Sequence, residues 1–250
     1  MKIIAKIYTE FDEKFGIPRQ SGLVETVGKI VFEPEYRNPE ALRGIDGYSH
    51  LWLLWQFSEA VRDTWSPTVR PPRLGGNKRM GVFATRSPFR PNPIGLSSVK
   101  LLEVKHTDNE GTVLIVEGAD LLSGTPIYDV KPYLPFTDSH PDAKGGFADD
   151  VKEYEIEVEV SDEVRAKLTS DEAKKLIALL RQDPRPSYKG EDDKIYGMKL
   201  SGKEIKFKYD NCKLLVTEIE SLQKNKKQGL STQIVILAFY FSVLFSFFIR

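Results

Sequence analysis

Short segments in which apolar residues alternate with polar ones, or run together, dominate the first half of the chain. Val27 to Phe32 alternates, whereas Leu51 to Phe57 is an almost continuous apolar run, which is typical of a strand buried on both faces. Further strands are predicted at residues 3–8, 81–84, 97–104, 112–118 and 127–130, and a short helix capped by Asn38 at residues 38–42. Short strands separated by turns, with no strand–helix alternation, predict a mainly β fold that is a barrel or a sandwich.

The composition changes between Pro141 and Asp150, where glycines and acidic residues replace apolar ones. Beyond this point Tyr154 to Val160 alternates like a strand with one exposed face, and helix starts are predicted at Ser161 and Ser170. The second helix has an apolar stripe of Ala173, Leu176, Ile177 and Leu180, and three more strands are predicted at residues 195–200, 204–209 and 213–219. We therefore expect a main domain at residues 1–145 and a small α+β domain at residues 151–220.

The stretch from Gly81 to Ser97 has the strongest indications of a functional site. Its residues 88–93 include three prolines, which restrict φ and remove backbone donors, so we expect a stiff loop. Arg86, Arg90 and nearby amide and hydroxyl side chains suit a phosphate, a carboxylate or a ribose. A proline-braced turn whose arginines only cap neighbouring carbonyl groups explains the pattern equally well.

The charges of the chain balance but are unevenly distributed. There are 36 Lys and Arg residues and 36 Asp and Glu residues, yet between Arg62 and Lys100 eight basic residues face the single acid Asp63. Such a basic block can bind a polyanion without making the whole protein a general nucleic-acid binder. The alternative is that some of these arginines pair with the acidic residues of the 142–163 segment.

The single cysteine, Cys212, excludes a disulfide within the chain and indicates a reducing compartment. Three scattered histidines leave little from which to build a metal site, so no metal is expected. The N-terminal apolar run is interrupted by charges and predicts a strand rather than a signal peptide, which favours a cytoplasmic protein.

The segment 221–250 does not fit the rest of the chain. A basic linker precedes an apolar stretch from Leu230 to Ile249, whose length just reaches the roughly 20 residues of a membrane helix. Three interpretations are open: a membrane anchor, a segment that docks on this or another subunit, or an extension foreign to an otherwise complete protein. The abrupt change in composition favours the last, and a membrane partner stays open.

Two further features of the sequence bear on contact with nucleic acid. Trp52 and Trp55 fit a core better than a stacking platform for a base. The segment from Asp183 to Tyr188 places an arginine and a tyrosine on a rigid turn, which suits an unstacked base and its phosphate, although a structural turn is favoured by the residues alone.

Several long, irregular motifs resemble one family. They are Gly81 to Ser97, Arg70 to Gly76, Asp183 to Tyr188, and the ranges 14–20, 49–52 and 129–135. Together they resemble the bacterial TsaA-like (YaeB, TrmO) tRNA methyltransferases, over roughly residues 1–220 and without the apolar tail. The resemblance implies a single-sheet β-barrel that binds S-adenosylmethionine without a Rossmann fold, followed by a small C-terminal domain. It also implies a homodimer that methylates N6-threonylcarbamoyladenosine after the anticodon of threonine tRNA.

The same resemblance implies the site residues. The expected cofactor contacts are Gln20, Ser21, Gly22, Ser58, Glu59, Arg86, Leu96, Asp120, Leu121, Leu122 and Ser123, of which positions 58 and 59 vary within the family. The expected contacts to the anticodon loop are Arg70, Arg73, Arg79, Arg90, Asp183, Arg185 and Tyr188. We hypothesise that Asp120 or Asp129 orients or removes the proton of the methylated nitrogen.

A different class of function also fits the sequence. The barrel could be a non-catalytic module that binds S-adenosylmethionine or a nucleoside and assists another RNA-modifying enzyme. A membrane-tethered variant is a third possibility, because of the tail.

Overall fold

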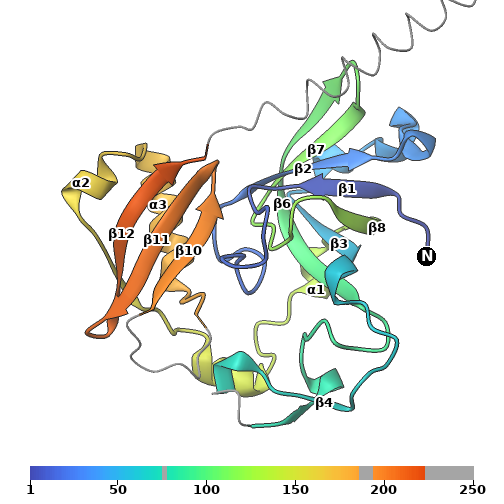
Figure 1. Ribbon diagram of the computed structural model, residues 1–250. Helices are drawn as coiled ribbons and strands as arrows, with labels where there is room; N and C mark the ends of the chain where they lie inside the picture. Colours follow the sequence, from blue (N-terminus) through green and yellow to red (C-terminus); the bar gives the residue numbers. More distant parts are fainter. Residues whose placement is uncertain (75–77, 186–193, 223–250) are drawn as a thin grey trace, which may run out of the picture.

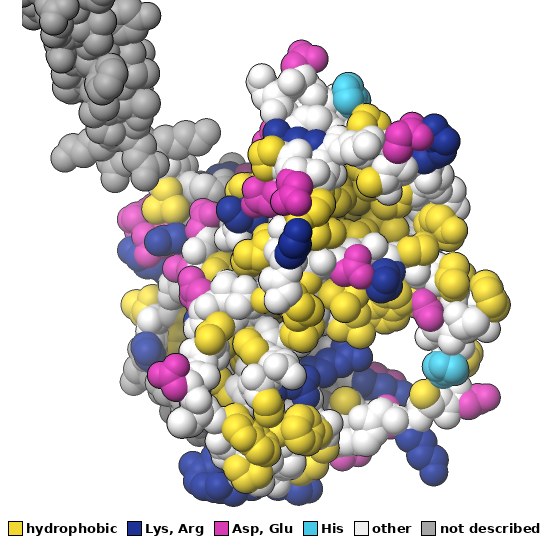
Figure 2. All heavy atoms as spheres, turned by 90° about the vertical axis from the view of Figure 1, so that its right-hand side faces the viewer, with side chains coloured by type: hydrophobic (Ala, Val, Ile, Leu, Met, Phe, Trp, Pro, Cys, Tyr) yellow, Lys and Arg dark blue, Asp and Glu magenta, His cyan; other side chains and the backbone are white. Residues whose placement is uncertain are grey.

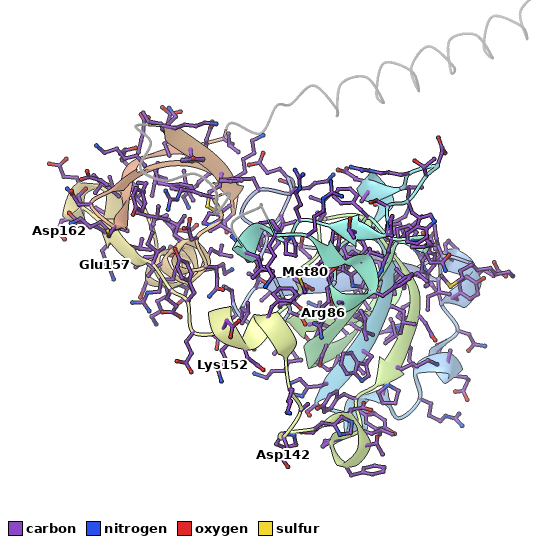
Figure 3. The ribbon with its side chains drawn as sticks, turned by 90° about the horizontal axis from the view of Figure 1, so that it is seen from below. Met80, Arg86, Asp142, Lys152, Glu157 and Asp162 are labelled. Carbon is purple, nitrogen blue, oxygen red and sulfur yellow. The ribbon has the colours of Figure 1, made fainter. Side chains whose placement is uncertain are left out.

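The computed structural model describes residues 1–74, 78–185 and 194–222, and it places two β assemblies side by side (Figure 1). The first is a closed barrel, and the second is a four-stranded sheet covered by helices. Lys152, on the linker between them, lies between the sheet and the barrel (Figure 3). The expected mainly β class, with a barrel followed by a small α+β unit, is confirmed. The exact domain bounds stay a prediction.

The barrel is closed by antiparallel pairing all the way round. In order around the barrel its strands are β1 (Ala5–Tyr8), β2 (Val27–Phe32), β7 (Gly111–Glu117), β6 (Ile94–Thr107), β3 (His50–Gln56) and β8 (Thr125–Pro132). Closure leaves this sheet with no unpaired edge, and inward-facing apolar side chains fill the interior. The barrel core includes Ile7, Ile30, Leu53, Leu114 and Ile127.

Strand β3 is buried on one face, so the prediction of burial on both faces is wrong. Leu51, Leu53 and Trp55 point into the barrel, and the residues between them are half-buried on the outer wall. That outer face is apolar because another segment covers it. The covering segment includes helix α1 (Pro135–Asp138), where Asp138 Oδ2 accepts a hydrogen bond of 2.7 Å from the Nε1–H of Trp52.

The expected strand at residues 81–84 is also wrong. The chain forms only the two-residue strand β5 (Met80–Gly81), which pairs with β4 (Thr68–Val69), and then turns into a 3₁₀ helix, η6 (Val82–Ala84). The buried side chain of Val82 and a hydrogen bond from the Thr85 hydroxyl to the Val82 carbonyl, at 2.9 Å, stabilise this turn. Local side-chain bonding of this kind competes with strand pairing.

The remaining 3₁₀ helices are short connections. They are η1 (Pro34–Tyr36), η2 (Pro39–Leu42), η3 (Ile45–Gly47), η4 (Ser58–Ala60), η5 (Pro72–Leu74) and η7 (Gly146–Val151). The predicted helix at 38–42 corresponds to η2, and the Asn38 side chain caps it by accepting from the backbone N–H of Glu40 at 3.0 Å.

The second sheet has the order β10 (Ile195–Leu200), β11 (Lys203–Asp210), β12 (Lys213–Ser221) and β9 (Glu157–Val160). The three antiparallel strands are the predicted ones, and β9 is parallel to β12. Helix α2 (Asp162–Arg165) starts at its predicted cap, Ser161, but α3 (Ser170–Arg181) is capped by Thr169 instead of Ser170. A capping box between Thr169 and Glu172 explains the shift. The buried stripe of α3 uses Leu179 where Ile177 was expected.

The loop between β1 and β2 ties the two assemblies together. Its Phe11 and Val24 are part of the core of the second assembly, and the ring of Phe15 stacks against those of Tyr196 and Phe207, each with centroids 6.2 Å away. A chain segment of the barrel therefore completes the second core. This anchors the start of the loop that runs on to Gln20.

The apolar tail lies outside the described residues, so its interpretations stay open. Within the described ranges, no helix has the length and apolar character needed to cross a membrane.

We expect Gly95→Ala to destabilise the barrel by about 1–3 kcal/mol, because a Cβ at this position would overlap the indole ring of Trp55 on the neighbouring strand. Urea unfolding followed by circular dichroism measures the loss. Gly47→Ala, where a Cβ would meet open space, is the control and should change the free energy of unfolding by less than about 0.5 kcal/mol. Equal effects at the two positions would contradict the packing argument.

Candidate active site

A cavity of about 590 Å³ opens at one end of the barrel. This volume is typical of sites for drug-sized ligands and cofactors. Four segments form its wall: the loop of residues 14–20, the end of β3 with residues 57–60, the 86–90 part of the proline-rich loop, and the start of β6. Asp120, Leu122 and Thr125 complete it. The site therefore combines segments that are far apart in the sequence, from Lys14 to Thr125.

A chain of buried hydrogen bonds leads to the carboxylate of Asp120. The Nε1–H of Trp55 donates to Ser97 Oγ at 3.0 Å, and Ser97 Oγ–H donates to Asp120 Oδ1 at 2.6 Å. Trp55 and Ser97 are buried, and Gly95 provides the space for the indole ring. The strand pairing of β3 with β6 thus fixes where this carboxylate lies.

Burial raises the pKa of Asp120 above its ordinary value of 3.8. Three interactions oppose the rise: the bond from Ser97, backbone N–H groups including that of Ser21, and the positive charge of Arg86. A carboxyl group whose pKa is raised inside a cavity can accept a proton more readily than an exposed one. Asp120 therefore lies at the cavity with a raised pKa, and its role with the proton stays a prediction.

Asp129 does not line the cavity, so the prediction that it could orient or remove the proton of the methylated nitrogen is wrong. It pairs with Leu54 across β3 and β8, on the outer wall of the barrel. Its carboxylate lies 3.0 Å from Lys131 Nζ and accepts from the backbone N–H of Val130 at 3.0 Å. A register shift in β8, which skips Tyr128 between Ile127 and Asp129, turns Asp129 outward although Ile127 faces the core.

Arg86 and Gln20 meet at the cavity wall. Arg86 Nη1 donates to Gln20 Oε1, and the side-chain amide of Gln20 donates in turn to the Arg19 carbonyl at 2.6 Å. Arg86 is exposed, and a guanidinium has further N–H groups suited to a carboxylate or phosphate. This pair supplies a positively charged corner opposite the apolar wall.

The structure divides the expected cofactor contacts into two groups. Those that line the cavity are Gln20, Ser58, Glu59, Arg86, Leu96, Asp120 and Leu122. Those that support it from behind are Ser21, Gly22, Leu121 and Ser123. Leu121 is part of the barrel core, and the backbone N–H of Ser123 donates to the Phe11 carbonyl at 2.8 Å.

Some lining residues were not expected from the sequence. Lys14 lies across from Glu59, with Nζ 3.1 Å from Glu59 Oε2, and the rings of Trp55 and Phe57 pack together with centroids 4.2 Å apart. Trp55 was placed in the core, and it is both buried and part of the wall. The family-like motif around residues 14–20 was the available signal for Lys14, but nothing in the sequence singled out Phe57.

The arginines expected to hold RNA are placed in different ways. Arg70 and Arg79 are exposed, and Arg79 Nη1 also donates to Thr68 Oγ1 at 3.1 Å. Arg90 lines the cavity while Nη2 donates to the carbonyls of Val82 and Thr85, at 3.4 and 3.3 Å, so it also braces the turn. Tyr188 and the side chain of Arg73 lie outside the described residues.

Asp183 and Arg185 are buried, which corrects the expectation that they form an exposed turn open to RNA. Arg185 Nε and Nη2 donate to the two carboxylate oxygens of Asp183 at 2.9 and 3.0 Å, and the guanidinium lies 3.9 Å from the centroid of the Tyr209 ring. The residues alone did not show that Tyr209 and the neighbouring strands enclose this turn.

The backbone carbonyls of these two buried residues contact the loop of residues 14–20, which lines the cavity. Arg19 Nη2 donates to the Asp183 carbonyl at 2.7 Å and to the Arg185 carbonyl at 3.4 Å. Since Gln20 follows Arg19 and holds Arg86, the second assembly positions one corner of the cavity. The segment from Asp183 to Arg185 therefore contributes to the site through the loop that it supports.

Comparison with known proteins supports the resemblance seen in the motifs. The family profile described as the tRNA-methyltransferase O N-terminal domain matches residues 6–139, and the TrmO C-terminal domain matches residues 153–222. The chain belongs to the TrmO family.

Individual relatives of this TrmO-family chain cover most of it. It is 42% identical over 227 residues to the tRNA (adenine(37)-N6)-methyltransferase of Escherichia coli K12, covering 87% of this chain and 96% of that protein. A probable S-adenosyl-L-methionine-binding protein of Pyrococcus abyssi is 35% identical over 145 residues, covering 58% of this chain and 73% of that protein. The crystal structure of TrmO from Pseudomonas aeruginosa matches with a TM-score of 0.68 and 33% identity, covering 88% and 97% of the two chains.

The raised pKa of Asp120 predicts a pH-dependent stability. The unfolded chain releases this proton near the ordinary pKa of 3.8, whereas the folded protein keeps it to a higher pH. As the pH rises from the unfolded pKa to the folded pKa, the buried carboxyl group therefore lowers the free energy of unfolding more and more. The free energy of unfolding of Asp120→Asn, relative to the unchanged protein, should therefore increase between about pH 4 and about pH 7. Urea unfolding at both pH values measures it.

Asp138→Asn is the control for this experiment, with the opposite sign. Hydrogen bonds from the Leu134 backbone and the Trp52 indole lower the pKa of Asp138, so its stabilisation is present above the ordinary pKa and is lost as pH falls. Its relative free energy of unfolding should decrease as the pH rises up to about pH 4 and should change little between about pH 4 and about pH 7. The same slope for both variants would contradict the assignment.

The buried position of Arg185 predicts a structural effect of its removal. Arg185→Ala leaves the carboxylate of Asp183 buried without its partner, so we expect a loss of about 3–5 kcal/mol in the free energy of unfolding. Arg79→Ala, at an exposed position, should change it by less than about 0.5 kcal/mol. Full stability of Arg185→Ala would show that the ion pair does not hold this turn.

Proposed function

We propose that this TrmO-family chain is an S-adenosylmethionine-dependent tRNA methyltransferase that methylates N6 of the adenine at position 37. We further propose that its substrate is the threonylcarbamoyl-modified adenosine of threonine tRNA. The observation that carries the proposal is the cavity in which Arg86 and Gln20, from two of the family-like motifs, lie together with Asp120. The name of the Escherichia coli relative supports the reaction, and that of the Pyrococcus abyssi relative supports the cofactor.

The residues of the cavity fit the cofactor chemically. S-adenosylmethionine supplies an activated methyl group, and it carries a carboxylate, an ammonium group, ribose hydroxyls and an adenine ring. Arg86 suits the carboxylate, and the oxygens of Glu59, Ser58 and Asp120 suit the ammonium and hydroxyl groups. Leu96 and Leu122 provide apolar surface for a ring. The segments holding these residues are braced from behind, so little reorganisation is needed on binding.

The protein contributes position and proton handling to methyl transfer. The lone pair of the adenine nitrogen forms the new bond to the methyl carbon, and the old bond electrons return to sulfur, so the nitrogen must lose its proton. The carboxylate of Asp120 can accept that proton, and the Ser97 hydroxyl holds the carboxylate in one orientation. Holding both partners in line and excluding water supplies most of the remaining acceleration.

The exposed arginines around the cavity support binding of a polyanion. Arg70 and Arg79 are exposed, and the block between Arg62 and Lys100 has one acidic residue, Asp63. Neutralising phosphates in this way predicts binding that weakens as salt increases. We include in the proposal a homodimer, as the resemblance implies, and a cytoplasmic location, which agrees with the single cysteine.

The test is methyl transfer from labelled S-adenosylmethionine to threonine tRNA with and without the threonylcarbamoyl group. We expect transfer to the modified tRNA alone, and a single-turnover rate lowered about 100-fold in Asp120→Asn through loss of the proton acceptor. Asp129→Asn, on the outer wall, should keep the rate within about twofold and serves as the matched control.

Three outcomes of this test would count against the proposal. Binding of both ligands without transfer would favour a non-catalytic module that assists another enzyme. Equal transfer to both tRNAs would reject the substrate. An unchanged rate in Asp120→Asn would reject its role with the proton.

A further inference from the structure

Two large aromatic side chains outside the cavity are unusually exposed. Trp65 is 52% exposed and Phe83 is 73% exposed, and their ring centroids lie 6.0 Å apart with an angle of 34° between the planes. Rings of this size bury most of their surface in ordinary folding, so an exposed pair in mutual contact indicates an interaction surface. Neither residue belongs to the cavity wall.

The pair is held rigidly and close to the cavity. Phe83 is in η6, between Val82 and Thr85, whose carbonyls accept hydrogen bonds from the cavity-lining Arg90. Trp65 precedes β4 and Phe83 follows β5, so both lie at the same end of this antiparallel pair, where the backbone N–H of Val82 donates to the Pro67 carbonyl at 2.9 Å. The turn that carries Phe83 continues directly to Arg86. The aromatic pair and the positive corner of the cavity are therefore parts of one braced segment.

The segments on either side of the pair carry more basic than acidic residues. Arg79 is exposed on the segment that leads into β5, and the guanidinium of Arg62 lies 3.8 Å from the centroid of the Phe89 ring at the cavity wall. In the lower part of Figure 2, hydrophobic side chains are bordered by Lys and Arg side chains. Aromatic rings within a basic surface are the combination that binds unpaired nucleotides, through base stacking and phosphate contacts.

We propose that Trp65 and Phe83 form a stacking platform for an unpaired base of the RNA loop, next to the adenine that enters the cavity. This inference rests on the proposed function. A base inserted between the rings would need about 7 Å between parallel faces, twice the spacing of about 3.4 Å between stacked bases. The observed tilt and separation do not provide that gap. The base therefore stacks on an outer ring face, with Phe83 offering the greater exposed area.

A second copy of this chain is the competing occupant of the patch. Symmetric self-association would bring the arginines of two identical basic surfaces together, and that repulsion disfavours it. RNA, with one phosphate per nucleotide, matches the same charges. The charge around the rings is therefore what favours nucleic acid.

The experiment compares Trp65→Ala, Phe83→Ala and the double variant with the unchanged protein, using modified threonine tRNA and the isolated anticodon stem-loop. We expect each single change to raise the KM and Kd for RNA about 5- to 150-fold, the range that corresponds to loss of one stacked base. The affinity for S-adenosylmethionine and kcat at saturating RNA should stay within about twofold. Phe83→Tyr should restore most of the affinity, because a ring face is retained.

Phe136→Ala is the matched control, because Phe136 is 83% exposed on α1 and has acidic rather than basic neighbours. It should leave RNA binding unchanged.

Stacking should also quench the fluorescence of Trp65 when the stem-loop is added, and Trp65→Phe should remove that change. Unchanged RNA affinity in the double variant would overturn the inference. It would also be overturned if light scattering showed a lower mass for the double variant than for the unchanged protein, because the rings would then hold two copies of the chain together. The unchanged protein tests the proposed function separately. If it binds the stem-loop but transfers no methyl group, the proposed function fails, while the effect of the variants on RNA affinity still tests the stacking platform.

Discussion

The close approach of the Trp55 ring to the backbone at Gly95 is the constraint on which the site depends. Only a residue without a Cβ leaves room for the indole where β3 pairs with β6. In that position the indole N–H reaches Ser97, and Ser97 reaches Asp120. A single packing contact in the barrel wall thus fixes a carboxylate at the cavity and places it in surroundings that raise its pKa.

The two assemblies are joined by a shared core and by hydrogen bonds and ion pairs to the loop between β1 and β2. Phe11 and Val24, from the loop between β1 and β2, are buried in the second core. Arg19, later in the same loop, donates to the carbonyls of Asp183 and Arg185. Two ion pairs also join this loop to the second assembly: Lys175 Nζ lies 2.6 Å from Glu10 Oε2 in a half-buried position, and the more exposed Lys199–Glu13 pair, at 3.9 Å, adds little because solvent screens it. The second assembly therefore acts on the cavity mainly by holding the loop that carries Gln20.

The proline-rich loop has two roles that the structure separates. Arg90 braces the turn by donating to two carbonyls, as a purely structural reading would have it, while Arg86 from the same loop lies at the cavity. The structural reading is thus confirmed for Arg90, and the ligand-binding reading of Arg86 stays a prediction. The bracing also orients the exposed ring of Phe83, so a structural hydrogen bond supports a candidate recognition surface.

The sequence by itself determined the strand and turn pattern, the mainly β class, the meander of β10 to β12 and, through its irregular motifs, the family. These follow from local periodicity, turn residues and the order of residues along the chain. Only the tertiary structure decided that Asp120 faces the cavity while Asp129 faces outward, that β3 has one core face, and that Asp183 and Arg185 are enclosed. The physical reason is that burial depends on which distant segments cover a residue. Barrel closure and the insertion of one loop into a second core are long-range events that no local pattern encodes.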